Sequence, residues 1–171
     1  MNIQDIQFIY DYNYWANGKI LAAASKVPQE QFIATAEFPF GISRGGSLRD
    51  TILHIVDAEY GWRGFFEAKK FNEDLNPDDL LTLELLEKKF KEEEKSMRAC
   101  LDRLTDEDVD SHYQYVNDEG ILRDRVLWHC LLHVVNHGTQ HRSEAAALLT
   151  RYNVSPGDLD FTLFLIESGN S

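Results

Sequence analysis

The sequence has few cysteines and prolines, no long apolar run and a deficit of positive charge. Only 2 cysteines and 4 prolines occur in 171 residues. Cys100 and Cys130 do not suggest a disulfide framework, so we expect free and mostly buried thiols. No apolar stretch approaches the ~20 residues that span a membrane. The start of the chain lacks the basic region and smooth apolar core of a signal peptide, which predicts a cytoplasmic protein with no membrane partner.

The charge balance argues against nucleic acid as a partner. Lys and Arg number 17 and Asp and Glu number 29, so the formal net charge is −12. A field of that sign repels phosphate backbones. The hydrophobic fraction of 43% is ordinary for a globular protein. The length predicts a single domain over residues 1–171 with a full core.

Four segments carry apolar residues at three- and four-residue steps, the pattern of amphipathic helices. They run roughly over 3–27, 47–70, 79 or 82 to 104, and 124–151. Pro28 ends the first segment, and Ser47 with Asp50 gives the second a start like a capping box. Residues around an Asp-Glu-Gly turn at 118–120 alternate weakly, so a short hairpin can form there. The predicted fold is all-α: a four-helix bundle with some crossing connections and a short C-terminal segment.

The fourth segment carries four of the six histidines. They follow one another at four-residue steps: His129, His133, His137 and His141. This spacing places neighbours on one face of a helix, where two imidazoles can bind a single metal ion. All four cannot share an ion, because ligands eight residues apart lie ~12 Å apart along the axis and metal–nitrogen bonds are only ~2.0–2.1 Å long. Further ligands must come from another segment.

The second segment supplies a candidate for that ligand, His54. Its helical neighbours Thr51, Ala58 and Gly61 are small, so the imidazole has room to meet another helix. Three neutral imidazoles leave coordination positions open for water or substrate, which is typical of catalytic sites, whereas structural zinc sites are closed by four protein ligands. Imidazole binds zinc, nickel, copper and iron, so the residues alone do not choose the metal.

Three adjacent pairs on the fourth segment satisfy the spacing: 129/133, 133/137 and 137/141. Polar neighbours that could orient the ligands favour the last pair; they are Asn136, Gln140 and Glu144. Gly138 would let another helix approach closely. His129 and His133 lie among apolar residues and are interpreted as core or pocket-wall groups, while His112 is expected at the surface. Hydrogen-bonded core histidines without any metal are the remaining alternative.

Other residues are candidates for lining a pocket, acting as a base or anchoring a substrate, on the basis of residue type alone. The first segment is dense in aromatics that either pack in the core and a subunit interface or line a pocket: Tyr10, Tyr12, Tyr14 and Trp15. Two acidic residues of the second segment could act as an outer-shell base: Asp57 and Glu59. Three arginines could anchor a substrate by charge: Arg44, Arg63 and Arg142. No Ser-His-Asp or Cys-His arrangement competes with the metal centre.

Four stretches resemble the DinB/YfiT-like family of metalloenzymes. They are YNYWAN at 12–17, SLRDTILHIVDAEYGW at 47–62, HVVNHGTQHRSEAA at 133–146 and SPGDLDF at 155–161. The resemblance implies a four-helix bundle whose ion is held by three histidines, which correspond by motif to His54, His137 and His141. His133 matches a recurrent family position beside the site. Many relatives read His-Arg-Gly-Gln where this chain ends the motif on Glu144, a change that leaves the ligands alone.

The resemblance also implies a divalent zinc or nickel ion, a homodimer and a small-molecule substrate. Characterised relatives of the family include transferases and isomerases that use low-molecular-weight thiols. The expected function is therefore a metal-dependent, thiol-dependent S-transferase-like activity. Three alternatives stay open: a metal-dependent hydrolase, a non-catalytic metal-binding or stress-related dimer, and a metal-free helical dimer. Neither the pattern nor the resemblance assigns a catalytic residue, a substrate or a particular thiol.

Overall fold

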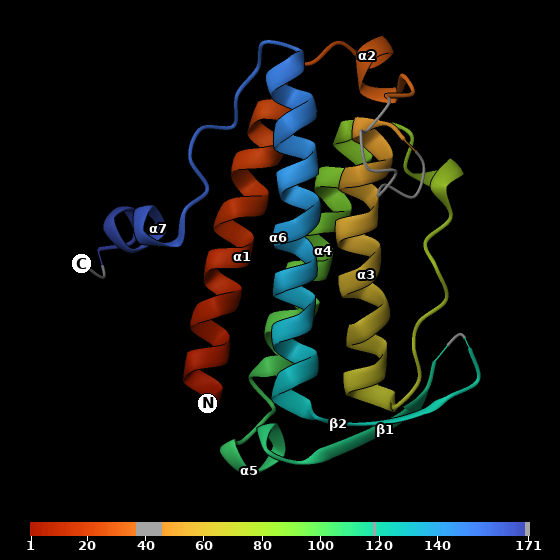
Figure 1. Cartoon of the computed structure of the whole chain (residues 1–171), viewed down its shortest axis with the longest axis vertical. Helices are drawn as coiled ribbons and strands as arrows, with labels where there is room; N and C mark the ends of the chain where they lie inside the picture. Colours follow the sequence, from red (N-terminus) through yellow and green to blue (C-terminus); the bar gives the residue numbers. More distant parts are fainter. Residues whose placement is uncertain (37–45, 118, 170–171) are drawn as a thin grey trace.

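Four long helices lie side by side in the computed structural model, which describes residues 1–36, 46–117 and 119–169 (Figure 1). They are α1 (Ile3–Ala24), α3 (Leu48–Ala68), α4 (Leu83–Leu101) and α6 (Leu127–Arg151). Each falls within a segment whose apolar periodicity predicts a helix, so the all-α class and the bundle are confirmed. Strands in the described ranges are limited to one two-stranded hairpin. No helix among these residues is both long and apolar enough to cross a membrane.

Polar side chains start three of the four long helices. Asn2, Ser47 and Thr82 each accept a hydrogen bond from the backbone N–H three residues further on. This satisfies a donor that the helix itself leaves free. At the start of α6, the N–H of Leu127 instead donates to the carbonyl of Ser111 at 2.9 Å. The segment before the hairpin thus helps to fix the beginning of the helix that carries the four histidines.

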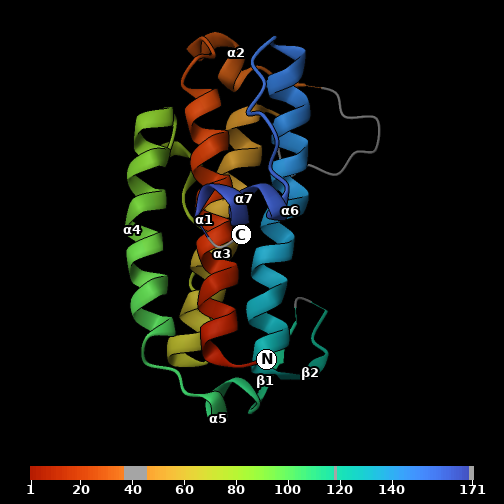
Figure 2. The same cartoon turned by 90° about the vertical axis from the view of Figure 1, so that its left-hand side faces the viewer.

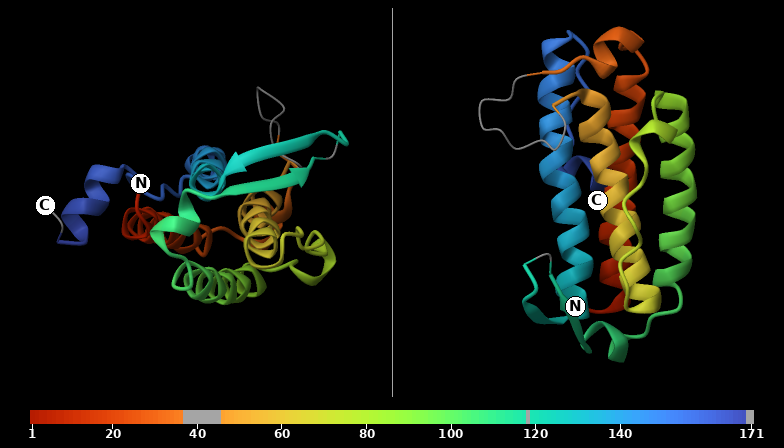
Figure 3. Two further views of the ribbon diagram at one scale, coloured as in Figure 1. Left: turned by 90° about the horizontal axis from the view of Figure 1, so that it is seen from below. Right: turned by 90° about the vertical axis from the view of Figure 1, so that its right-hand side faces the viewer.

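The core runs along α6, which packs against both α1 and α3. The bundle is seen from two further sides in Figure 2 and in the right panel of Figure 3. Buried side chains form two clusters, one at each end of the bundle. The first includes Ile6, Phe65, Met97 and Leu131, and the second includes Ile20, Ile52, Leu86 and Leu148. Both cysteines are free and buried, as predicted.

A hairpin joins α5 (Asp106–Val109) to α6 and covers one end of the bundle. Its strands β1 (His112–Val116) and β2 (Leu122–Val126) are antiparallel, with His112 opposite Val126. Gly120 in the turn has a φ of 75°, a left-handed conformation that glycine adopts without strain. The hairpin lies where α3 ends and α6 begins (Figures 1 and 3). The predicted hairpin is therefore confirmed.

Three further short helical segments occur in the connections and after α6. They are α2 (Gln29–Ile33), the 3-10 helix η1 (Pro77–Asp79) and α7 (Phe161–Glu167). The apolar pattern does not resolve them or α5, because one or two turns carry too few residues to show a period. α7 lies across α1 (Figure 2).

Aromatic side chains of α1 pack within the chain. The Tyr12 ring lies 5.2 Å from that of Phe161, and the Trp15 ring lies 5.8 Å from that of Phe164. Tyr10 is buried in the core. The packing interpretation of these aromatics is confirmed, while their part in a subunit interface stays a prediction.

Candidate metal centre

Three histidines from two helices meet in the middle of the bundle. His54 comes from α3, and His137 and His141 come from successive turns of α6. One ring nitrogen from each lies within 4.8 Å of the others. The ring centroids are 4.8 Å apart for His54 and His137, 4.5 Å for His54 and His141, and 4.4 Å for His137 and His141. This cluster could hold a metal ion. It contains the favoured pair of α6, His137 and His141, together with His54, the further ligand predicted from another segment.

A carboxylate orients one of the three rings. Oε2 of Glu144 lies 2.8 Å from Nδ1 of His141, and only 5% of His141 is exposed. Because Nδ1 is engaged, Nε2 is the nitrogen left to bind an ion. Of the three polar neighbours that the sequence suggests as orienting groups, Glu144 takes this role. Asn136 and Gln140 are exposed on the outer side of α6.

The protonation state of the cluster suits cation binding. Burial, followed by the neighbouring rings of His141 and His54, lowers the pKa of His137 to about 3. The His137 imidazole is therefore neutral at physiological pH, and its lone pair is available to a metal ion. A neutral ring beside two others is the state that a three-imidazole site requires.

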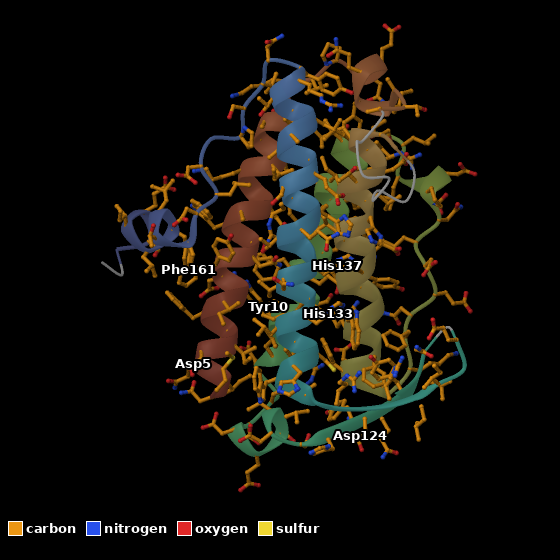
Figure 4. The ribbon with its side chains drawn as sticks, viewed as in Figure 1. Asp5, Tyr10, Asp124, His133, His137 and Phe161 are labelled. Atoms are coloured by element: carbon orange, nitrogen blue, oxygen red, sulfur yellow. The ribbon has the colours of Figure 1, made fainter. Side chains whose placement is uncertain are left out.

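The other two histidines of α6 lie outside the cluster. Both His129 and His133 are exposed, and neither is among the described residues that line the cavity beside the cluster, so their interpretation as core or pocket-wall groups is wrong. The His129 ring packs against Trp128 at 4.0 Å. His133 lies one turn before His137 on α6 (Figure 4), with its ring 5.3 Å from that of Trp62. His112 is at the surface, as predicted, where its Nδ1 lies 2.7 Å from a carboxylate oxygen of Asp124.

A cavity of about 490 Å³ opens beside the cluster, with His54 and His137 in its lining. Its floor on α3 includes the small residues Ala58 and Gly61. The remaining wall comes from α3, the connection that follows it, and the hairpin. It consists of three aromatic residues, two acids, two amides and a valine: Trp62, Phe71, Tyr115, Asp57, Asp74, Asn72, Asn117 and Val116. The cavity has the size of a small-molecule site.

A buried arginine lies directly after His141 in the sequence and takes no part in the cavity lining. Only 1% of Arg142 is exposed. Its guanidinium donates to the side chains of Asn13, Asn17 and Thr139, and to the backbone carbonyl of Val135. Burial lowers its pKa to about 10, so the group is still charged at neutral pH. Arg142 ties α1 to α6 inside the protein, and its proposed role as a substrate anchor is wrong.

Glu59 belongs to the same interior network. Its carboxylate accepts hydrogen bonds from Asn13 Nδ2 at 3.1 Å and from the Tyr14 hydroxyl at 2.8 Å. Asn13 therefore bridges the buried carboxylate of Glu59 and the buried guanidinium of Arg142. Burial raises the pKa of Glu59 to about 7, although both hydrogen bonds act in the opposite direction. This network was not predicted; its signal is the pair Asn13 and Asn17, one turn apart on the apolar face of α1.

Of the remaining candidate residues, Arg63 has a structural role and Asp57 lines the cavity. Arg63 is engaged by carboxylates, with its Nε 2.5 Å from Oε1 of Glu93 and its Nη1 2.6 Å from Oε2 of Glu67. It serves packing between α3 and α4. Asp57 lines the cavity and accepts a hydrogen bond from the N–H of Leu75 at 2.7 Å. Arg44 lies outside the described residues.

Comparison with known proteins identifies the family. The sequence profile of the DinB family matches residues 2–168. The chain belongs to the DinB family. It is 26% identical over 162 residues to "Protein DinB" of Bacillus subtilis (strain 168), a match that covers 92% of this chain and 91% of that protein.

A solved structure bears out the fold of this DinB-family chain. A DinB-like protein from Bacillus cereus ATCC 10987 superposes with a TM-score of 0.71 at 14% identity, over 92% of this chain and 97% of that one. At that identity the likeness concerns the fold alone. It agrees with the bundle that the apolar periodicity predicts.

Proposed function

We propose that this DinB-family chain is a metal-dependent enzyme whose divalent ion is held by His54, His137 and His141. The observation that carries the proposal is the convergence of three imidazole nitrogens within 4.8 Å at the side of a cavity. Three protein ligands leave coordination positions open, as in catalytic sites. Zinc and nickel both suit neutral imidazole nitrogens, and we expect one of them.

The reaction we favour is the transfer of a group to or from a low-molecular-weight thiol. A divalent ion held by the three histidines would lower the pKa of a thiol or water and so supply a nucleophile near neutral pH. His54 and His137 face the cavity from which a substrate would approach. The carboxylate of Glu144 engages Nδ1 of His141, which leaves Nε2 of that ring for the ion. Three aromatic residues, Trp62, Phe71 and Tyr115, line another part of the same cavity.

Hydrolysis is the second candidate, because a carboxylate lines the same cavity. Asp57 follows His54 by three residues on α3 and shares its cavity. A carboxylate in that place could accept a proton from a water molecule at the cavity edge. The two reactions are separated by assaying thiol transfer and ester hydrolysis on one preparation of metal-loaded protein.

The experiment that tests the site is metal analysis of tag-free protein by mass spectrometry. Wild type should carry about one zinc or nickel ion per chain, as one three-histidine site requires, and His54→Ala and His137→Ala should each lose it. His129→Ala is the matched control, because His129 is exposed and lies outside the cluster. Wild type that takes up no metal after incubation with zinc or nickel would overturn the proposal. Full metal occupancy without turnover would instead favour a non-catalytic metal-binding protein.

Two wider expectations accompany the proposal. We expect residues 1–171 to fold as one domain and to form a cytoplasmic homodimer with a small-molecule substrate. Light scattering after size-exclusion chromatography measures the mass in solution, and a monomer at all concentrations would contradict the dimer. Limited proteolysis that leaves the chain at nearly its full length would support a single domain.

A further inference from the structure

We propose that the substrate of this centre carries an uncharged aromatic or apolar group, which packs against Trp62, Phe71 and Tyr115 while its reacting end lies at the histidines. The inference rests on the proposed function and adds the chemical class of the substrate to it. It concerns the part of the cavity that takes no part in holding an ion.

The three rings form one continuous wall. The Trp62 centroid lies 4.9 Å from that of Phe71 and 5.6 Å from that of Tyr115, and the last two are 5.6 Å apart. All three line the cavity and none is fully buried. Apolar surface left in contact with water is unfavourable, and an aromatic ring covers such a wall well because edge-to-face contacts add to the burial. The wall therefore favours a flat apolar ligand group.

The wall is held in place by the core behind it. Phe65, which is 1% exposed, stacks on Phe71 at 4.9 Å with an interplanar angle of 12° and lies 5.4 Å from Tyr115. The next residue, Asn72, donates from its side chain to the carbonyl of Tyr60 at 2.8 Å. A Cβ on Gly64 would come within 2.5 Å of that Asn72 side chain. The segment that follows α3 therefore packs directly against this helix. A preformed wall loses little entropy when a ligand binds.

The distance between the wall and the histidines sets the length of the ligand. Trp62 follows His54 by eight residues on α3, which corresponds to ~12 Å along the helix axis. Ala58 and Gly61 lie in the cavity lining between them. Apart from the adjacent residues and backbone of α3 itself, no atom of the described residues lies within 4 Å of the position that a Cβ on Gly61 would take. The small floor keeps this stretch open. A ligand of several bonds can thus join a group at the histidines to a ring at the wall.

The charges around the cavity disfavour an anionic end group. Asp57 and Asp74 are in the lining, and the described lining residues include no Lys or Arg. The chain as a whole carries a formal charge of −12. A carboxylate or phosphate next to the aromatic wall would be repelled by these charges and would lose its hydration against apolar rings.

The test measures thiol affinity of the full chain loaded with cobalt(II), whose charge-transfer absorption reports a bound thiolate without any turnover. The probes are 4-phenylbutane-1-thiol and a methoxy-terminated oligo(ethylene glycol) thiol of the same length, with 2-mercaptoethanol as a short reference. In wild type, the aromatic thiol should bind roughly tenfold more tightly than the ether thiol, as expected for burial of an apolar ring. Trp62→Leu and Gly61→Leu should remove most of that preference. The second variant fills the floor of the cavity and leaves the wall intact.

Trp15→Leu is the matched control, because Trp15 packs against α7 on the other side of α1 and should keep the full preference. Equal affinity for the two long thiols in wild type would overturn the inference while leaving the metal centre standing. A preference that survives in both Trp62→Leu and Gly61→Leu would overturn it as well. Failure of every thiol, including 2-mercaptoethanol, to produce the absorption band would refute the proposed thiol chemistry itself.

Discussion

The carboxylate of Glu144 and the imidazole of His141 form a pair one turn apart on α6, with Oε2 and Nδ1 separated by 2.8 Å. Both side chains are shielded from water, with 12% and 6% of their surface exposed. A carboxylate in this position fixes the ring orientation and makes the opposite nitrogen a better ligand. The affinity for a metal ion should therefore depend on a residue that does not touch the ion.

Removal of that carboxylate should weaken metal binding without unfolding the protein. We expect Glu144→Ala to raise the dissociation constant for zinc by ~10–100-fold, the usual effect of losing such a partner. Glu144→Gln keeps an acceptor oxygen and should lose less. Competition with a chelator of known affinity measures the constants. Ser143→Ala, at an exposed neighbour, is the control, and an effect of equal size there would contradict the proposed role of Glu144.

Metal binding should stabilise the fold, because the ligands come from two helices that unfolding separates. An ion at 1,000 times its dissociation constant adds about 4 kcal/mol to the free energy of unfolding when it binds only the folded state. In a chain of this size, that corresponds to a rise in Tm of roughly 10 °C. Differential scanning calorimetry with zinc and with a chelator measures the shift. His129→Ala should show the full shift and His54→Ala almost none; an equal shift in both would place the ion elsewhere.

Substitution of glycine by alanine should have opposite effects on the free energy of unfolding at two positions. A Cβ on Gly138 would lie 2.7 Å from Nη1 of Arg142 and 3.1 Å from Oδ1 of Asn13. Because the guanidinium is buried and held by four acceptors, it cannot move aside freely, so we expect Gly138→Ala to destabilise the protein by about 1–3 kcal/mol. Gly18 lies within α1, and apart from the adjacent residues and backbone of that helix, no atom of the described residues lies within 4 Å of its Cβ position. Gly18→Ala should stabilise it by about 0.5–1 kcal/mol, and urea denaturation measures both.

The buried carboxyl of Glu59 should make stability fall as the pH rises. Its pKa is raised from 4.5 to about 7, so between these values the unfolded chain has released the proton and the folded chain still holds it. Rising pH then favours unfolding, by about 3 kcal/mol across this window. Glu59→Gln removes the titration, so the free energy of unfolding of the variant minus that of wild type should increase from pH 5 to pH 8. Gln31→Ala, at an exposed residue with no titratable group, should give a difference that does not change with pH in this way.

The sequence predicts the elements whose determinants are local. Four helices follow from apolar periodicity, and the hairpin follows from alternation around a turn that contains Gly120. The cluster of His54, His137 and His141 follows from helical spacing together with motif resemblance. The helices and the hairpin depend on residues close together in the sequence. The histidine cluster depends on one contact between two helices.

Other features depend on angles and long-range contacts that the pattern does not contain. A four-residue step advances ~40° beyond a full turn of an α-helix, so a row of four histidines winds around α6. His129 is turned ~120° from His141 by this drift and faces solvent. The link from Glu59 through Asn13 to Arg142 joins three helices, and residues 13 and 142 are 129 positions apart. No periodicity within one segment reports such a contact.

The aromatic wall and the histidine cluster share α3, which carries both Trp62 and His54, but their other residues lie in different kinds of structure. The histidines lie on the buried faces of two long helices, where substitutions disturb the core. Phe71 and Tyr115 lie in a connection and on a hairpin strand, where substitutions are tolerated more readily. Substitutions at these two positions can therefore change the ring contacts without altering the three histidines. The shape and polarity of the cavity can thus change while the three-histidine cluster keeps its geometry.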